Sequence, residues 1–344
     1  MAYTTINKSS SFMNPRLYTG NAGTKNVTGV GFKPDWVWTK NRQDTYNHSL
    51  FDVVRGATKR IASNATLAEA TVSASLTAFG SDGFSLGNDT TANASNLYAS
   101  WNWLAGGSQG SSNTDGSINT TYTSVNTTAG FSISQYTGTG SAGATFGHGL
   151  GSKPAMIIFK CLSVAGPSWV VYHQSKGATY TLYLDQTSAG GASAEMLNNT
   201  EPTSSLITLG NGTSSNSSAP TIAYCFSEKV GYSKFGSYIG NGNVDGTFIY
   251  TGFKPAFVMV KNTSATENWI IFDNTRPGRN LTDALLKPNL NNVESTNGVK
   301  FDLLSNGFKA RVNDAEGNSS GASYIYMAFG QSLVGTNNIP NNAF

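Results

Sequence analysis

Three short apolar runs in the chain begin in the same way, on a Lys-Pro pair that follows a glycine. The runs are 31–40, 151–160 and 252–261, and each closes on a lysine six residues after its proline. Proline fixes φ and has no N–H to donate to a ladder, so it suits the residue where a strand begins. The apolar residues that follow predict a strand buried on both faces. Three copies of this start signal predict three copies of one domain.

The residues around the runs also repeat in order. Each repeat opens on a Tyr-x-Gly segment, and a second strand carries an aromatic residue 11, 12 and 11 residues after the closing lysine, at Phe51, Tyr172 and Phe272. The last aromatic residues, Trp103, Phe226 and Phe329, follow 52, 54 and 57 residues later. Many short strands in units longer than the ~20–45 residues of a solenoid repeat are typical of a β-sandwich. We predict an all-β fold of three tandem β-sandwich-like domains derived from an internal repeat.

These signals divide the chain into six segments. We expect an N-terminal arm at 1–16, repeat 1 at 17–105, a linker with an extra strand at 106–129, repeat 2 at 130–230, repeat 3 at 231–334 and a loose C-terminal tail at 335–344. The Gly/Ser-rich residues 105–116 are expected to be flexible. In repeat 1, a helical turn is expected only within 66–76.

Composition agrees with an all-β protein rich in turns. Charged residues make up 12% of the chain, about half the usual share of roughly 25%. The net charge is only +3 and the densest basic cluster, 55–60, is interpreted as a solvated turn, so we expect no nucleic-acid partner. No apolar run approaches the ~20 residues that span a bilayer, and residues 1–8 lack the pattern of a signal peptide. We expect synthesis in a bacterial cytoplasm, and the two cysteines, Cys161 and Cys225, to be buried without a disulfide.

No pattern of catalytic or metal-binding residues emerges. The histidines His48, His148 and His173 lack the spacing of metal ligands. A Gly-x-Ser-x-Gly match at 106–110 falls in the expected linker and not between a strand and a helix. Glu69 and Glu294, at matching repeat positions, are expected to be structural rather than a hydrolytic pair. We therefore predict no enzyme, no catalytic residues, no cofactor and no metal.

Two tryptophan pairs, Trp36 with Trp38 and Trp101 with Trp103, raise the question of a sugar-stacking surface. Trp36 and Trp38 point to one face of their strand, which makes them the candidate ligand contacts if that face is exposed. Core packing is the favoured interpretation. Trp169 and Trp269 occupy equivalent repeat positions and are expected to be core anchors.

Several stretches give the chain a resemblance to a known group. They are 1–6, 17–21, 34–42, 51–57, 231–238, 252–259 and 324–329. In these stretches, which extend over nearly its whole length, the chain resembles repeat-containing virion structural proteins of marine bacteriophages. The resemblance implies a virion structural protein and carries no catalytic pattern.

We therefore expect a non-enzymatic phage virion surface protein that serves as a tail-fibre or receptor-binding component. The alternatives are a capsid decoration or head-fibre protein docked by one domain or by the N-terminal arm, and a glycan depolymerase of a tail spike. The expected partners are other virion proteins of the tail or capsid, a host surface glycan or protein, and further copies of the chain. No membrane insertion is expected.

Overall fold

The three repeats fold into three copies of one sandwich, and the computed structural model describes residues 4–276 and 280–332. Each repeat has a main sheet. In repeat 1 its strands are β1 (Met13–Thr19), β3 (Trp36–Asn41), β4 (Ser49–Asp52) and β9 (Leu97–Trp103). In repeat 2 they are β10 (Tyr122–Asn126), β11 (Phe131–Thr137), β13 (Met156–Cys161), β14 (Val170–His173), β15 (Tyr180–Tyr183), β16 (Gly191–Ala192) and β18 (Pro220–Phe226), and in repeat 3 they are β19 (Ser233–Ile239), β21 (Pro255–Asn262), β22 (Trp269–Asp273) and β25 (Ser323–Gly330). The three sheets share the antiparallel orders β1-β9-β3-β4, β11-β18-β13-β14 and β19-β25-β21-β22. The predicted all-β class with three tandem sandwich-like domains is confirmed.

A smaller sheet packs on one face of each main sheet. Its strands are β2 (Lys25–Thr28), β7 (Leu76–Gly80) and β8 (Gly83–Leu86); β12 (Thr145–Gly147) and β17 (Leu206–Thr208); and β20 (Phe248–Tyr250), β23 (Phe301–Leu304) and β24 (Gly307–Ala310). A local apolar core fills the space between the two sheets of every copy. In repeat 1, for example, Val37 and Phe51 of the main sheet meet Val27 and Phe84 of the small one.

The short helices lie outside the segment in which a helical turn was expected. They are η1 (Ser9–Ser11), α1 (Thr90–Asn93) and α2 (Thr213–Asn216). α1 begins at Asp89, whose side chain accepts a hydrogen bond from the Thr91 N–H, as an N-cap does. The helical turn expected within 66–76 is wrong, because that segment contains β6 (Ala70–Thr71), which pairs with β5 (Lys59–Arg60). In the described chain, no helix has the length and apolar composition needed to cross a membrane.

The strands that follow the Lys-Pro pairs are buried on both faces, as predicted. Their closing lysines, Lys40, Lys160 and Lys261, are 1%, 0% and 0% exposed. Each Nζ donates to a carbonyl of the loop that follows: to Asp44 at 3.2 Å, Pro167 at 2.8 Å and Glu267 at 2.7 Å, respectively. Burial lowers the pKa of Lys40 and Lys261 to about 8. These lysines hold the chain at the end of each strand.

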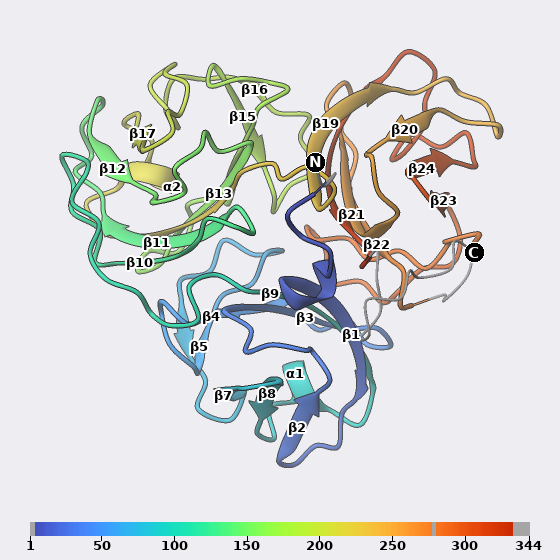
Figure 1. Ribbon diagram of the computed structural model, residues 1–344, viewed down its shortest axis with the longest axis horizontal. Coiled ribbons are helices and arrows are strands. Elements are labelled where there is room, and N and C mark those ends of the chain that lie inside the picture. The colour runs from blue at the N-terminus through green and yellow to red at the C-terminus, as the bar shows by residue number, and fades with distance from the viewer. Residues whose placement is uncertain (1–3, 277–279, 333–344) are drawn as a thin grey trace.

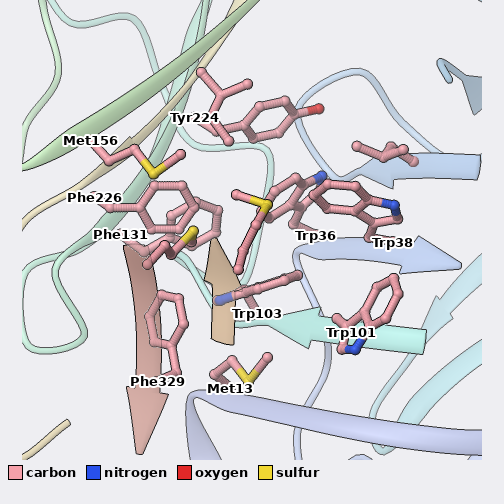
Figure 2. Packing of buried hydrophobic residues seen from close by; sticks show 14 of the residues in the cluster. Met13, Trp36, Trp38, Trp101, Trp103, Phe131, Met156, Tyr224, Phe226 and Phe329 are labelled. Atoms are coloured by element: carbon pink, nitrogen blue, oxygen red, sulfur yellow. The ribbon is translucent and has the colours of Figure 1, made fainter. Parts of the chain in front are cut away.

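The second face of every main sheet turns toward a single centre. In Figure 1 the three copies, blue, green to yellow, and orange to red, surround this centre as three lobes. Trp36, Trp103, Tyr224, Phe226 and Phe329 meet there in one apolar cluster to which all three repeats contribute. Figure 2 shows their rings packed together between the sheets. The molecule therefore has three local cores and a shared central core.

A ring of hydrogen bonds closes around this centre. Strand register makes His48, Trp169 and Trp269 equivalent, each three residues before the aromatic residue of its strand. Each reaches a main-chain carbonyl of a neighbouring repeat: Trp169 Nε1 donates to Ala62 at 2.9 Å, Trp269 Nε1 to Tyr183 at 2.7 Å, and His48 Nε2 to Lys287 at 3.0 Å. Repeat 2 thus binds repeat 1, repeat 3 binds repeat 2, and repeat 1 binds repeat 3. The expectation that Trp169 and Trp269 are core anchors is confirmed, with both side chains at most 1% exposed.

A second ring uses the last residue of the neighbouring strand. Tyr224 Oη donates to Asp52 at 2.7 Å, and Trp101 Nε1 donates to Asp273 at 2.9 Å, each across a repeat boundary. At the third boundary the residue equivalent to Trp101 and Tyr224 is Met327, which has no donor. There the carboxylate is replaced by His173, whose Nε2 donates to the Tyr326 carbonyl at 3.1 Å.

Two buried arginines complete the carboxylate sites. Arg55 binds Asp52 at 2.6 Å and Glu69 at 3.2 Å, and the equivalent Arg276 binds Asp273 at 2.7 Å and Glu294 at 3.2 Å. Glu69 and Glu294 are structural, as predicted. The interpretation of 55–60 as a solvated turn is wrong for Arg55, whose side chain is 1% exposed. A guanidinium is tolerated in the interior because its donors are matched by carboxylates.

The terminal and linking segments differ from the expected arm and flexible linker. β1 begins at Met13, so residues 13–16 lie within the main sheet of repeat 1. Ile6 is 2% exposed and packs into the central core, and Figure 1 shows the N-terminal segment running over the junction of the lobes. Asp35 Oδ2 accepts hydrogen bonds from the N–H groups of Ala105 and Gly107, both at 2.7 Å, which ties down the start of the linker. The tail expected at 335–344 lies outside the described residues.

Candidate functional site

The tryptophan pair considered as a ligand surface lies inside the molecule. Trp36 and Trp38 are each 1% exposed. The ring of Trp36 stacks on that of Tyr224 with 4.5 Å between centroids, and Trp38 Nε1 donates to His48 Nδ1 at 2.8 Å. The face of β3 that carries both residues is the one that turns to the central core (Figure 2). Core packing describes both residues, and neither presents a surface to a ligand.

The histidines and cysteines are also interior. His48, His148 and His173 are at most 1% exposed, and burial lowers their pKa values to about 3, 4 and 4. The structure brings them to separate places. Among the described residues, no three His, Cys, Asp or Glu side chains gather in a way that could hold a metal ion. Both cysteines are buried and free, as predicted.

A hollow on repeat 2 arises from a difference between the copies. In repeat 1, Arg60 forms an ion pair at 3.0 Å with Asp89, the N-cap residue of α1. The positions equivalent to these two in repeat 2 are Thr181 and Gly212, the N-cap residue of α2. In repeat 3, the position of Arg60 holds Leu285, which packs into the local core. Repeat 2 therefore carries two small residues, Thr181 and Gly212, where repeat 1 carries an ion pair.

The strand register establishes these equivalences. Leu50 pairs with Ile61, Val171 with Leu182, and Ile271 with Leu286, so the residues one position before Ile61, Leu182 and Leu286 correspond. The position one residue after them holds Ala62, Tyr183 and Lys287. Of the three repeats, only repeat 2 therefore has an aromatic side chain at this position, Tyr183, two residues after Thr181.

Two neighbouring cavities with shared lining residues occupy this place, and we call them together the Tyr183 groove. The outer cavity is an open hollow of about 490 Å³ lined by Val164, Gly166, Pro167, Ser168, Tyr183, Thr213, Ser214 and Ser217. The inner cavity, about 80 Å³, is lined by Val170, Thr181, Tyr183, Ser193, Glu195, Met196, Gly212, Thr213, Ser214 and Ser215. Tyr183, Thr213 and Ser214 belong to both.

Hydroxyl groups dominate the walls of the Tyr183 groove. Its lining includes Tyr183, two threonines and five serines, and Glu195 is the one charged residue in it. Thr181 is 3% exposed, and its Oγ1 has no hydrogen-bond partner in the described part of the chain. A buried hydroxyl without a partner is costly, and because this atom exposes less than 1 Å², a ligand in the groove reaches it only if the Thr181 side chain turns toward the cavity.

The main chain at Tyr183 is held by strand pairing and by a hydrogen bond from repeat 3. Tyr183 ends β15, where the neighbouring Leu182 pairs with Val171, and its carbonyl accepts the hydrogen bond of Trp269 Nε1 at 2.7 Å. The main chain that carries the aromatic ring is therefore part of the ring of contacts between repeats. A side chain placed in this way needs little reorganisation to receive a ligand.

Sequence reasoning missed this groove, although a signal was present. The contrast between Arg60 with Asp89 and Thr181 with Gly212 is visible in the sequence. This contrast indicates a groove only when the two positions of each pair are known to face each other across the sandwich. Comparing the strongest aromatic positions of the repeats instead pointed to the buried Trp36 and Trp38.

Comparison with known proteins gives a family and no functional relative. Neither the search of curated proteins nor the search of solved structures finds a match. A family model described as a domain of unknown function, DUF7483, matches residues 8–332, and the chain belongs to that family.

Proposed function

We propose that the chain is a non-enzymatic structural protein on the surface of a bacteriophage virion, where it serves as a tail-fibre or receptor-binding component. The proposal starts from the sequence resemblance and is supported by the use that the fold makes of its polar residues. At the repeat boundaries, His48 and His173 bind main-chain carbonyls, and two buried aspartates, each paired with an arginine, accept hydrogen bonds from Tyr224 and Trp101. They are thereby committed to structure instead of to chemistry on a substrate.

The closed arrangement of the three repeats carries this proposal. Three similar domains around one centre give a single chain the shape of a small trimer, a form that fits symmetric assemblies. Because the copies differ in sequence, one of them can carry a binding site while all three form the shared central core. The Tyr183 groove in repeat 2 is such a specialised place.

The capsid decoration or head-fibre role remains the alternative placement. In it, the N-terminal arm would be a docking element. The described part of that segment folds back instead, with Ile6 in the central core and the Ser10 N–H donating to Ser332 Oγ at 3.0 Å. A docking contact would therefore involve the outer faces of the domains. Such a contact is compatible with attachment to a tail as well as to a head.

The depolymerase role has less support from the geometry. Hydrolysis of a glycosidic bond ordinarily needs two carboxyl groups about 5–9.5 Å apart. Among the described residues that line the Tyr183 groove, Glu195 is the single carboxylate. A glycan bound there would be held without being cleaved.

Immunogold labelling of purified virions tests the proposed placement. Antibodies raised against the recombinant chain should label the tail, and prior absorption with the recombinant chain should abolish the label. Label spread over the capsid lattice would favour the decoration role instead. Intact virions without label would overturn the proposal.

A further inference from the structure

We propose that the Tyr183 groove binds a neutral glycan. This inference rests on the proposed adhesive function and names the class of ligand for it. The outer hollow of about 490 Å³ lies within the range of roughly 300–1,000 Å³ found for small-ligand sites. Its opening to solvent leaves room for a sugar chain to continue beyond the bound residues.

The lining matches the chemistry of a sugar. A pyranose ring presents an apolar face of C–H groups and an edge of hydroxyls that both donate and accept hydrogen bonds. Tyr183 offers an aromatic surface with a polar tip, and Val164 and Pro167 extend the apolar wall. Serine and threonine hydroxyls act as donors and acceptors in turn, so Ser168, Ser214 and Ser217 suit the hydroxyl edge.

The inner cavity supplies the most specific contact. Thr181 lines it from β15, nearly buried, with its Oγ1 unpartnered among the described residues. Repeat 1 fills the same place with the Arg60–Asp89 ion pair and repeat 3 with Leu285, so the space is not required by the fold. Thr181 Oγ1 exposes less than 1 Å² in the free protein, so a hydroxymethyl or hydroxyl group of a sugar in this cavity bonds to it once the Thr181 side chain turns toward the cavity.

The charge of the lining selects against acidic sugars. No lysine, arginine or histidine appears among the residues that line either cavity, and Glu195 contributes a negative charge to the inner one. Binding a uronic acid or a sulfated sugar would bring an anion near Glu195 without a cation to compensate. A neutral sugar avoids this repulsion.

Saturation-transfer NMR on the full chain tests the proposal. The probes are the methyl glycosides of glucose, galactose, mannose and N-acetylglucosamine, with methyl glucuronide as the acidic comparison. At least one neutral glycoside should receive saturation from the protein, while the glucuronide should receive none. Tyr183→Ala should weaken binding about tenfold or more, because it removes the aromatic surface.

Two further variants make the test specific to the groove. Thr181→Val keeps the branched shape of the side chain and removes only the hydroxyl, so it should weaken binding about threefold to tenfold even if Tyr183→Ala folds poorly. Tyr250→Ala removes a tyrosine that is 60% exposed on β20 of repeat 3, far from the groove in sequence, and should leave binding unchanged. Circular dichroism and thermal unfolding verify that each variant is folded.

Three results would overturn the proposal: no transfer to any neutral glycoside, loss of binding in Tyr250→Ala with Tyr183→Ala unaffected, or wild-type affinity in both groove variants. The virion placement is judged separately by immunogold labelling. A chain that labels the tail and binds no glycoside would refute this inference alone.

Discussion

At the scale of single residues, the chain places charge in its interior only where the charge is matched. Arg276 is fully buried beside Asp273, and the same carboxylate also accepts from Trp101 Nε1 across the boundary to repeat 1. Arg276 and its neighbours lower the pKa of Asp273 despite burial, which by itself would raise it. Removing Asp273 leaves the buried Arg276 with only the longer ion pair to Glu294, at 3.2 Å, in a low-dielectric environment.

We therefore expect Asp273→Ala to lower the free energy of unfolding by about 3–5 kcal/mol. The double variant Asp273→Ala, Arg276→Met should recover much of this loss, because no lone charge remains. Urea unfolding followed by circular dichroism measures both. A single variant that unfolds within about 1 kcal/mol of the wild type would contradict the buried pair.

At the scale of elements, the presence of the strands was predictable and their pairing was not. The Lys-Pro pairs identified β3, β13 and β21, and the matched spacings identified the later strands that carry Phe51, Tyr172 and Phe272. The helical turn was misplaced: Thr66 and Glu69 have the spacing of a capping box, but the Glu69 carboxylate binds Arg55 and residues 70–71 pair with β5, whereas α1 forms after the cap at Asp89. The Tyr183 groove could not be predicted, since it depends on side chains that face each other across a sandwich, over thirty residues apart in sequence.

The Tyr-x-Gly segments that open each repeat show how an element is positioned by close approach. Tyr18, Tyr136 and Tyr238 each donate from the hydroxyl to a main-chain carbonyl near the short helix or its equivalent: to Ala92, Ser215 and Gly317, respectively. The glycine two residues later lies against the same segment. A Cβ added at Gly138 would come within 2.2 Å of the Ser217 carbonyl oxygen.

Gly138→Ala should therefore destabilise the protein by about 1–3 kcal/mol through overpacking. The matched control is Gly191→Ala in β16, because an added Cβ there meets nothing within 4 Å. Thermal unfolding should show a lower midpoint for the first variant and almost no change for the second. Equal effects of the two substitutions would refute close approach as the reason for glycine at 138.

At the scale of the whole molecule, the three domains depend on one another. The sequence indicated three copies, but their closed arrangement rests on contacts between residues of different type, such as His48 with Lys287 and Trp169 with Ala62. No spacing between residues in the sequence predicts this ring of hydrogen bonds between the repeats. Because the central core is shared, a lobe that unfolds exposes apolar surface on the other two, and we expect calorimetry to show one transition. Three separable transitions would contradict a shared core.

The same arrangement makes the molecule sensitive to acid. His48 and His173 sit neutral at two repeat boundaries, with pKa values lowered by burial to about 3 and 4 from an ordinary value near 6.5. Above pH 6.5 they are neutral in both the folded and the unfolded chain and have no effect on pH dependence. As the pH falls from 6.5 toward 4, the unfolded chain binds protons that the folded chain cannot, so stability decreases. At pH 5 the loss is about 2 kcal/mol for each histidine.

Asp35, which binds the start of the linker, changes the stability in the opposite direction as the pH falls. Burial raises the pKa of Asp35 to about 6, so between pH 6 and 4 the folded chain binds a proton more readily than the unfolded chain, which adds stability. The slope of the wild type is therefore the difference between these contributions. It does not by itself identify the histidines.

His173→Gln isolates the contribution of one boundary. The glutamine amide can still donate to the Tyr326 carbonyl, now at 3.1 Å from His173 Nε2, but it cannot take up a proton. Stability at pH 7 should change little, and between pH 6.5 and 4 the variant should lose less stability than the wild type, by up to one proton in the slope of unfolding free energy against pH. Urea unfolding at a series of pH values measures this slope. An unchanged slope would mean that His173 takes up its proton as readily in the folded chain as in the unfolded chain, and the boundary between repeats 2 and 3 could then not rest on a neutral imidazole.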